Sequence, residues 1–168
     1  VLDVADHLVG QVGVLAHHRP RTGAGLRPGR THSDDVLLQP WARALVKMRH
    51  DRFLADEPYT RSKPSPGARS FGAAYGIELL NLPGTNRVYL FMTGGPHTFR
   101  VVYLDGRSHP RNLTPSNFGH SIGWWEGDPL VAATTNFKSY SGFAGTTETL
   151  HVVERFTRKD ADTLIYEF

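Results

Sequence analysis

Between residues 97 and 137 the chain alternates extended runs with sharp turn signals, and this pattern constrains the fold more than any other. Residues 98–104 read TFRVVYL, a β-branched and aromatic run that ends at Asp105-Gly106. Asp-Gly is a strong turn dipeptide because glycine tolerates the positive φ that tight turns need. A second turn, Glu126-Gly127-Asp128, separates two further extended runs, so residues 119–137 are predicted to form a β-hairpin.

The same period of two continues on both sides of this stretch. GIELLNL (76–82) and RVYLFM (87–92) flank a PGTN turn, while ETLHVVERF (148–156) precedes TLIYEF (163–168). Short strands with turns every 8–12 residues or so are typical of β-barrels and β-sandwiches. The sequence therefore predicts a mainly β fold, an antiparallel β-barrel or sandwich from about residue 73 to 168.

One amphipathic helix is predicted before the strands, over about residues 40–53. Pro40 suits the first helical turn, and Trp41, Leu45 and Met48 form an apolar stripe among basic residues. We expect this stripe to pack across the sheet, and the alternative that it lies on a membrane surface stays open. No apolar run in the chain approaches the roughly 20 residues of a membrane span.

Residues 1–35 are predicted to be a basic arm or linker outside a single β-rich domain of residues 36–168. Residues 19–30 contain four Arg, three Gly and two Pro, a composition that favours an extended segment. Residues 1–70 carry 11 Lys and Arg against 7 Asp and Glu, a net charge of +4. Such an arm can dock on anionic lipid, nucleic acid or an acidic partner, and the alternative is a solvated tail.

Several function classes are disfavoured by what the sequence lacks. The absence of cysteine excludes disulfides, cysteine-ligated zinc and thiol nucleophiles. Ser121 lies in GHSIG, but a predicted hairpin follows it instead of the strand–turn–helix that a nucleophile elbow needs. No glycine-rich loop leads into a helix, which argues against nucleotide binding. The aromatic residues lie among acids and glycines, which argues against nucleic acid.

Three motifs carry a resemblance to a known family: DGRSHP (105–110), GHSIGWWEGDPLV (119–131) and ERFTRKDADTL (154–164). Over about residues 38–168 the chain resembles a family of uncharacterised bacterial β-rich proteins that are typically exported with a signal peptide. The resemblance implies a periplasmic or secreted location and brings no named activity. Because the chain starts at Val1 and not at Met, we expect a processed or fragmentary product.

The chain departs from the family pattern at three positions. Pro129 stands where the family usually has Thr, Ala133 where it usually has Asp, and Ser62 where a Cys is common. An activity that relatives build on that Asp or Cys would therefore be absent here.

Strand alternation singles out Glu154. It is predicted to share the apolar face of its strand with Val152 and Phe156, where a carboxylate needs a partner or a proton. Arg100 is the nearest partner by pattern and His120 the next. Two interpretations stay open: a structural Glu–Arg pair, or an acid–base residue in a pocket.

The histidines supply the other candidate residues. His109, in the DGRSHP loop, is a candidate general base with Asp105 or Arg107 orienting a substrate; the alternative is a turn held by Asp105. The histidine spacing matches no metal motif, so no metal site is predicted, and no motif identifies a cofactor. The predicted catalytic residues are His120, His109 and Glu154, and the predicted ligand-binding residues are Asp105, Arg107, Trp125, Glu126 and Arg100.

Three functions follow from these observations. The first is an exported or envelope β-barrel module that binds a small apolar or aromatic ligand or a partner protein. The second is a cofactor-free or metal-assisted acid–base enzyme (a hydrolase, lyase or isomerase) that uses His and Glu. The third is an accessory structural subunit of a larger periplasmic or membrane-associated complex, docked through the basic arm. The deciding observation is whether a concave cavity lies beside His120 and Glu154.

Overall fold

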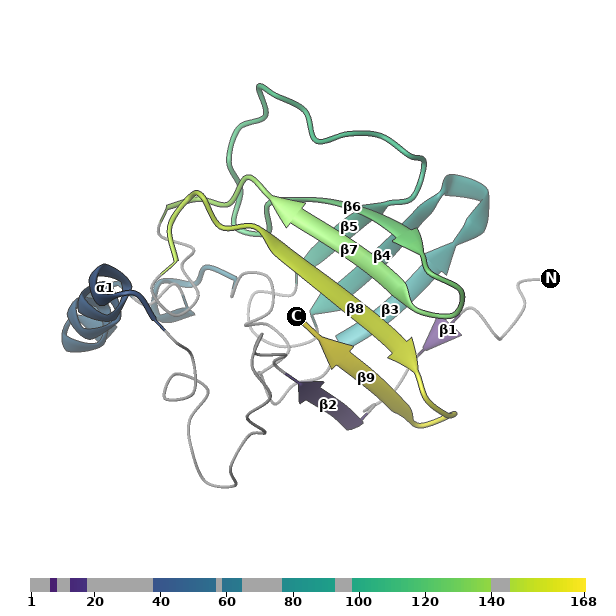
Figure 1. The fold of residues 1–168 in the computed structure, drawn as a ribbon, viewed down its shortest axis with the longest axis horizontal. Coiled ribbons are helices and arrows are strands. Elements are labelled where there is room, and N and C mark those ends of the chain that lie inside the picture. Colours follow the sequence, from purple (N-terminus) through teal and green to yellow (C-terminus); the bar gives the residue numbers. More distant parts are fainter. Residues whose placement is uncertain are drawn as a thin grey trace.

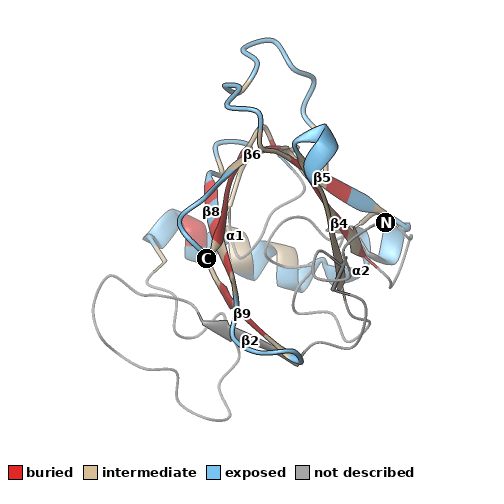
Figure 2. Ribbon diagram, turned by 90° about the vertical axis from the view of Figure 1, so that its right-hand side faces the viewer, coloured by how far each residue is buried: buried red, intermediate tan, exposed pale blue. Residues whose placement is uncertain are grey.

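A computed structural model describes residues 7–8, 13–17, 38–56, 59–64, 77–92, 98–139 and 146–168. Within these residues the chain forms one curled, mostly antiparallel sheet, which has the shape of an open half-barrel (Figure 2). The strands follow one another in the order β1-β3-β4-β5-β6-β7-β8-β9-β2 (Figure 1). The predicted mainly β fold is confirmed. The strands are β1 His7–Leu8, β2 Gly13–His17, β3 Ile77–Leu82, β4 Arg87–Met92, β5 Phe99–Tyr103, β6 His120–Trp125, β7 Leu130–Thr135, β8 Val152–Arg158 and β9 Thr163–Glu167.

The predicted hairpins form at their turn signals. β3 and β4 are joined by a short 3₁₀ turn, Pro83–Thr85, followed by Asn86 at a φ of 51°. β6 and β7 are joined around Gly127, which has a φ of 70°. There the Glu126 N–H donates to the Pro129 carbonyl at 2.9 Å and closes the turn. Each turn thus uses a residue type that tolerates a left-handed backbone.

One pairing in the centre of the sheet differs from the prediction of antiparallel neighbours. β5 and β6 run parallel, with Val102 opposite Ser121. The physical reason is the length of the connection from Leu104 to Gly119, because a long crossover lets the chain enter the next strand from the same end. Gly119 completes this return with a φ of 68°, and a Cβ there would lie 2.3 Å from the Thr135 carbonyl oxygen.

The core fills the inner, concave face of the half-barrel. Alternate residues of β4, β5, β7, β8 and β9 point inward, so the period of two in the sequence becomes one apolar layer. Gly123 of β6 also faces this layer, and a Cβ on it would lie 2.5 Å from Val102 Cγ1. The strands therefore approach closely at this point. The buried apolar residues are Val88, Leu90, Met92, Val102, Leu130, Ala132, Phe156, Leu164 and Tyr166.

The predicted helix is present as α1 (Pro40–Asp51), followed by a single turn, α2 (Phe53–Asp56), and a 3₁₀ turn at Tyr59–Arg61. The helix was expected to pack its apolar stripe across the sheet. Instead, α1 lies at the side of the half-barrel (Figure 1). Trp41 and Met48 of the expected stripe are 59% and 47% exposed, and Ala42 is the buried residue. Arg49 attaches the helix by donating to the carbonyls of Thr146 (3.0 Å) and Ser139 (3.2 Å).

Two pieces of the predicted N-terminal arm belong to the sheet. β1 pairs antiparallel with β3, and β2 pairs parallel with β9, so they form the two edges. Residues 19–35, predicted to be extended, lie outside the described residues. Among the described residues, no helix combines the length and the apolar character that crossing a bilayer requires.

Candidate functional site

The inner face of the half-barrel contains a buried polar group of three residues. Glu154, fully buried on β8, accepts a hydrogen bond from Arg100 Nη1 of β5 at 2.7 Å. Its other carboxylate oxygen accepts the hydroxyl of Tyr166, from β9, at 2.8 Å. The partner predicted for Glu154 is therefore the one observed. A carboxylate and a guanidinium buried this close form an ion pair, which favours the structural interpretation of Glu154.

Tyr166 is the member of this group that the sequence analysis missed. The alternation of TLIYEF puts it on the same face as Leu164, and a buried tyrosine hydroxyl usually finds a partner. Burial raises the pKa of Tyr166 above its ordinary value, and the negative charge of Glu154 raises it further. Its hydroxyl therefore stays protonated and acts as a donor to the carboxylate.

The outer face contains a second polar cluster, built around two histidines. His109, in the connection before β6, and His120, the first residue of β6, have their Nδ1 atoms 2.9 Å apart. One Nδ1–H must therefore donate to the lone pair of the other Nδ1, which requires different tautomers in the two rings. Burial lowers the pKa of both rings; for His109 the nearby His151 adds to this, and for His120 the nearby His109 and Arg107 do so.

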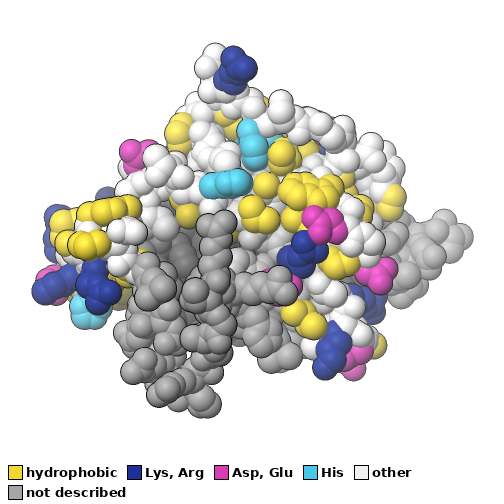
Figure 3. Space-filling model, viewed as in Figure 1, with side chains coloured by type: hydrophobic (Ala, Val, Ile, Leu, Met, Phe, Trp, Pro, Cys, Tyr) yellow, Lys and Arg dark blue, Asp and Glu magenta, His cyan; other side chains and the backbone are white. Residues whose placement is uncertain are grey.

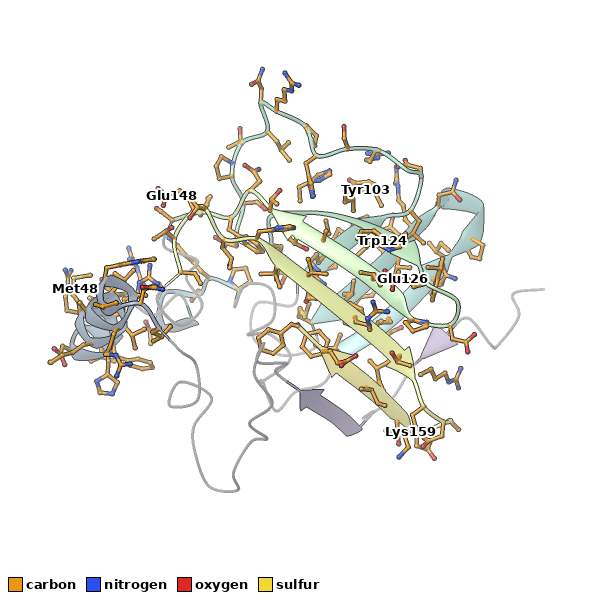
Figure 4. All side chains as sticks on the ribbon, viewed as in Figure 1. Met48, Tyr103, Trp124, Glu126, Glu148 and Lys159 are labelled. Atoms are coloured by element: carbon orange, nitrogen blue, oxygen red, sulfur yellow. The ribbon has the colours of Figure 1, made fainter. Side chains whose placement is uncertain are left out.

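Tyr103, labelled in Figure 4, links these histidines to Arg107. Its ring stacks on His120 with centroids 5.3 Å apart, and the Arg107 guanidinium lies over it at 4.0 Å from the ring centroid. Arg107 also pairs with Asp105, and its hydrogen bonds lower the pKa of that carboxyl to about 2. These contacts hold the connection between β5 and β6 against the outside of the sheet.

The structure separates the predicted catalytic residues. His120 lies opposite Thr135 of β7, whereas Glu154 lies opposite Ala132. Thr135 and Ala132 are three residues apart on one strand, so they point to opposite faces of the sheet. His109 and His120 meet on the outside, and Glu154 lies on the inside. His120 and Glu154 therefore do not line one cavity.

The predicted ligand-binding residues divide in the same way. Asp105 and Arg107 join the outer cluster, and Arg100 joins the inner group. Trp125 lies exposed at the end of β6. Glu126 accepts hydrogen bonds from Trp124 Nε1 at 2.9 Å and from Arg155, so it supports the β6–β7 turn (Figure 4). Histidines and apolar side chains are neighbours on the surface that Figure 3 shows.

A pocket of about 470 Å³ opens where β5 begins and the connection returns to β6. Phe99, Phe118 and two prolines, Pro64 and Pro115, give it apolar walls, and the remaining lining residues are polar. Sequence reasoning missed this site because its residues come from a strand, a loop and the segment after β7. The described lining includes Thr98, Phe99, Ser116, Asn117, Phe118 and Lys138.

Among the described side chains, no group of three or more His, Asp and Glu residues is arranged to hold a metal ion. Comparison with protein-family models, with curated proteins and with solved structures finds no match. The resemblance to exported bacterial proteins therefore stays a prediction.

Proposed function

We propose that this chain is a binding module that holds a small apolar or aromatic ligand in the pocket at the start of β5. The observation that carries the proposal is the pocket itself, formed between Phe99 of β5 and Phe118 of the returning connection. Its volume of about 470 Å³ lies within the roughly 300–1,000 Å³ range of small-molecule sites. An exported or periplasmic location is part of the proposal and is supported by the family resemblance alone.

The lining suits a ligand with an apolar body and a few polar atoms. Two aromatic rings offer flat apolar surface, and Phe99 is 54% exposed although it is a large aromatic residue. Thr98, Ser116 and Asn117 add hydroxyl and amide groups that can fix the orientation of a ligand. Apolar walls with a small number of placed polar groups are the usual composition of a small-molecule site.

The acid–base enzyme has weaker support from the same geometry. The His109–His120 pair can accept a proton, because the lowered pKa values favour neutral rings at pH 7. Glu154, however, lies on the opposite face and is neutralised by Arg100. A mechanism that uses all three residues together is therefore disfavoured. The accessory-subunit proposal depends on the arm, of which residues 19–35 lie outside the described part.

Titration with N-phenyl-1-naphthylamine, a neutral apolar dye, tests the binding proposal. We expect a saturable rise in dye fluorescence with one site per chain. Replacing Phe99 by Ser should weaken binding about two- to tenfold, the effect of losing one aromatic contact.

Val153→Ser is the matched control for this titration. Val153 is also an exposed apolar strand residue, 48% accessible, but it does not line the pocket. The control should bind the dye like the parent protein. Equal losses in both variants, or no saturable binding by the parent protein, would contradict the proposal.

A further inference from the structure

Phe99, which lines the pocket, is one of three aromatic residues whose rings lie against one another on the outer face of the sheet. Its ring centroid lies 5.8 Å from that of Phe91 and 6.0 Å from that of Tyr89. The rings of Tyr89 and Phe91 are stacked, with an angle of 18° between their planes and 6.1 Å between their centroids. We call Tyr89, Phe91 and Phe99 the aromatic row.

Strand register explains why these three rings meet. Phe91 of β4 lies directly opposite Phe99 of β5, and Tyr89 precedes Phe91 by two residues on the same strand. Residues two apart on a strand share a face of the sheet, so all three side chains point the same way. Leu90, which lies between two of them, is fully buried in the inner core. The aromatic row therefore lies on the outer face.

The aromatic row holds the Phe99 ring in place but leaves part of it open. Phe99 is exposed, while Tyr89 and Phe91 are half-buried. A ring that packs against neighbouring rings loses little conformational freedom when a ligand binds to its open side. On the other wall of the pocket, Phe118 packs against the buried core of the sheet. Both apolar rings of the pocket are thus positioned before any ligand arrives.

Two positioned rings favour one shape of ligand over another. Aromatic rings attract one another in offset-stacked or edge-to-face arrangements, and this attraction adds to the effect of the area that they bury. A saturated ring system of the same size is thicker and lacks the charge distribution of a π-system. A flexible chain also loses rotational freedom when it is bound. The walls therefore match a flat aromatic molecule better than an aliphatic one.

We propose that the pocket selects flat, fused-ring aromatic molecules over aliphatic molecules of equal size. The rings of the ligand lie against Phe99 and Phe118, while Phe91 and Tyr89 act by positioning the Phe99 ring. This inference rests on the proposed binding function and narrows its ligand to one chemical class.

A matched pair of neutral alcohols tests the inference by calorimetry on the full chain at pH 7: 2-(2-naphthyl)ethanol and its decahydro analogue, in which both rings are saturated. The naphthyl compound should bind about three- to tenfold more tightly, because the two alcohols differ only in the aromaticity of their rings. Equal affinities, or tighter binding of the saturated compound, would overturn this inference and leave the proposed function standing. Absence of binding by both compounds would overturn both.

Two leucine variants locate the selectivity. Phe99→Leu keeps an apolar side chain but removes the ring, so the preference for the naphthyl compound should fall to about twofold or less. Trp125→Leu is the matched control, because Trp125 is an exposed aromatic strand residue outside the described lining of the pocket. This control should keep the preference of the parent protein. A preference that persists in Phe99→Leu, or that falls equally in Trp125→Leu, would overturn the assignment.

Discussion

Glu154 and Arg100 show how a single pair of residues defines the inside of this half-barrel. Both are buried in a layer of apolar side chains, and Arg100 Nη1 lies 2.7 Å from Glu154 Oε2. Removing two charges from water is costly, so each side chain is tolerated only because the other is present. Tyr166 completes the group by donating to the remaining oxygen of the carboxylate.

Replacing Glu154 by Gln should destabilise the protein by about 3–5 kcal/mol, because Arg100 is left as a buried charge without its counter-ion. Chemical denaturation measures the change in the free energy of unfolding. Glu126→Gln is the control, since its pair with Arg155 is exposed and its loss should have a much smaller effect. Equal effects of the two substitutions would show that the buried pair does not hold the sheet together.

For these residues the sequence predicted the partner of Glu154 correctly, but it did not predict on which face His120 lies. Alternation around Glu154 identified Arg100, because each residue follows the apolar period of its own strand. Alternation within one strand does not determine how faces correspond between strands, however, since that depends on register. For this reason the sequence did not show that His120, the second candidate partner of Glu154, lies on the opposite face of the sheet.

The connection between β5 and β6 links the outer polar cluster to the pocket. Its first half is held to the outer face by His109 and Arg107, and its second half supplies Ser116, Asn117 and Phe118 to the pocket. A long polar loop with Pro and Asn gives no sequence signal for this arrangement, because both contacts are made with distant strands. The parallel pairing of β5 and β6 was not predicted, because the length of this connection does not determine from which end the chain enters β6.

Acidification should loosen this connection through the histidine pair. A hydrogen bond between two Nδ1 atoms tolerates one added proton but not two. The cation Arg107 and the imidazole of His151 face the pair, and Asp105 is held by Arg107. Because both folded-state pKa values are lowered, the stabilisation is complete above the ordinary histidine pKa of about 6.5. It is lost as the pH falls below 6.5 through the folded-state values.

Hydrogen exchange between pH 7.5 and pH 5, corrected for intrinsic rates, measures this effect. Protection of residues 105–119 should fall with pH in the parent protein and depend less on pH in His109→Asn, which cannot take up the proton. His50→Asn, on the exposed side of α1, is the control and should behave like the parent protein. A pH dependence that persists unchanged in His109→Asn would contradict the role of the pair.

Within the described residues, helix α1 is attached to the rest of the chain through Arg49 and not through its predicted apolar stripe. The amphipathic pattern predicted the helix itself correctly, but a pattern does not specify which surface the apolar stripe meets. In the structure the attachment uses Arg49, whose guanidinium donates to two carbonyls in the segment between β7 and β8. A side-chain anchor of this kind cannot be recognised from helical periodicity.

Arg49→Ala should release α1 without unfolding the sheet. Both hydrogen bonds from Arg49 to Thr146 and Ser139 are lost, so we expect faster hydrogen exchange in residues 40–51 and unchanged exchange in β7 and β8. Arg43→Ala, an exposed position on the same helix, is the control and should leave exchange unchanged. If the two variants exchange alike, the helix is held by other contacts.

For the molecule as a whole, the sequence predicted the architecture better than the site. Turn dipeptides and period two define strands locally, so the half-barrel followed from Asp105-Gly106, Gly127 and the alternating runs. The pocket is a property of the folded chain, because Thr98, Phe118 and Lys138 meet only after the sheet has curled. It combines the apolar rings of Phe99 and Phe118 with the polar residues Thr98, Ser116 and Asn117 at one end of the sheet.

Chemical-shift mapping by NMR during titration with N-phenyl-1-naphthylamine is the most direct test that the pocket is a binding site, since it reports where a ligand binds. We expect saturable shifts at Thr98, Phe99 and Lys138 and at residues 116–118, with the resonances of Trp124 and Val153, which do not line the pocket, unchanged. Shifts confined to residues that do not line the pocket, or no saturable shifts during the titration, would contradict the assignment of the pocket as a binding site.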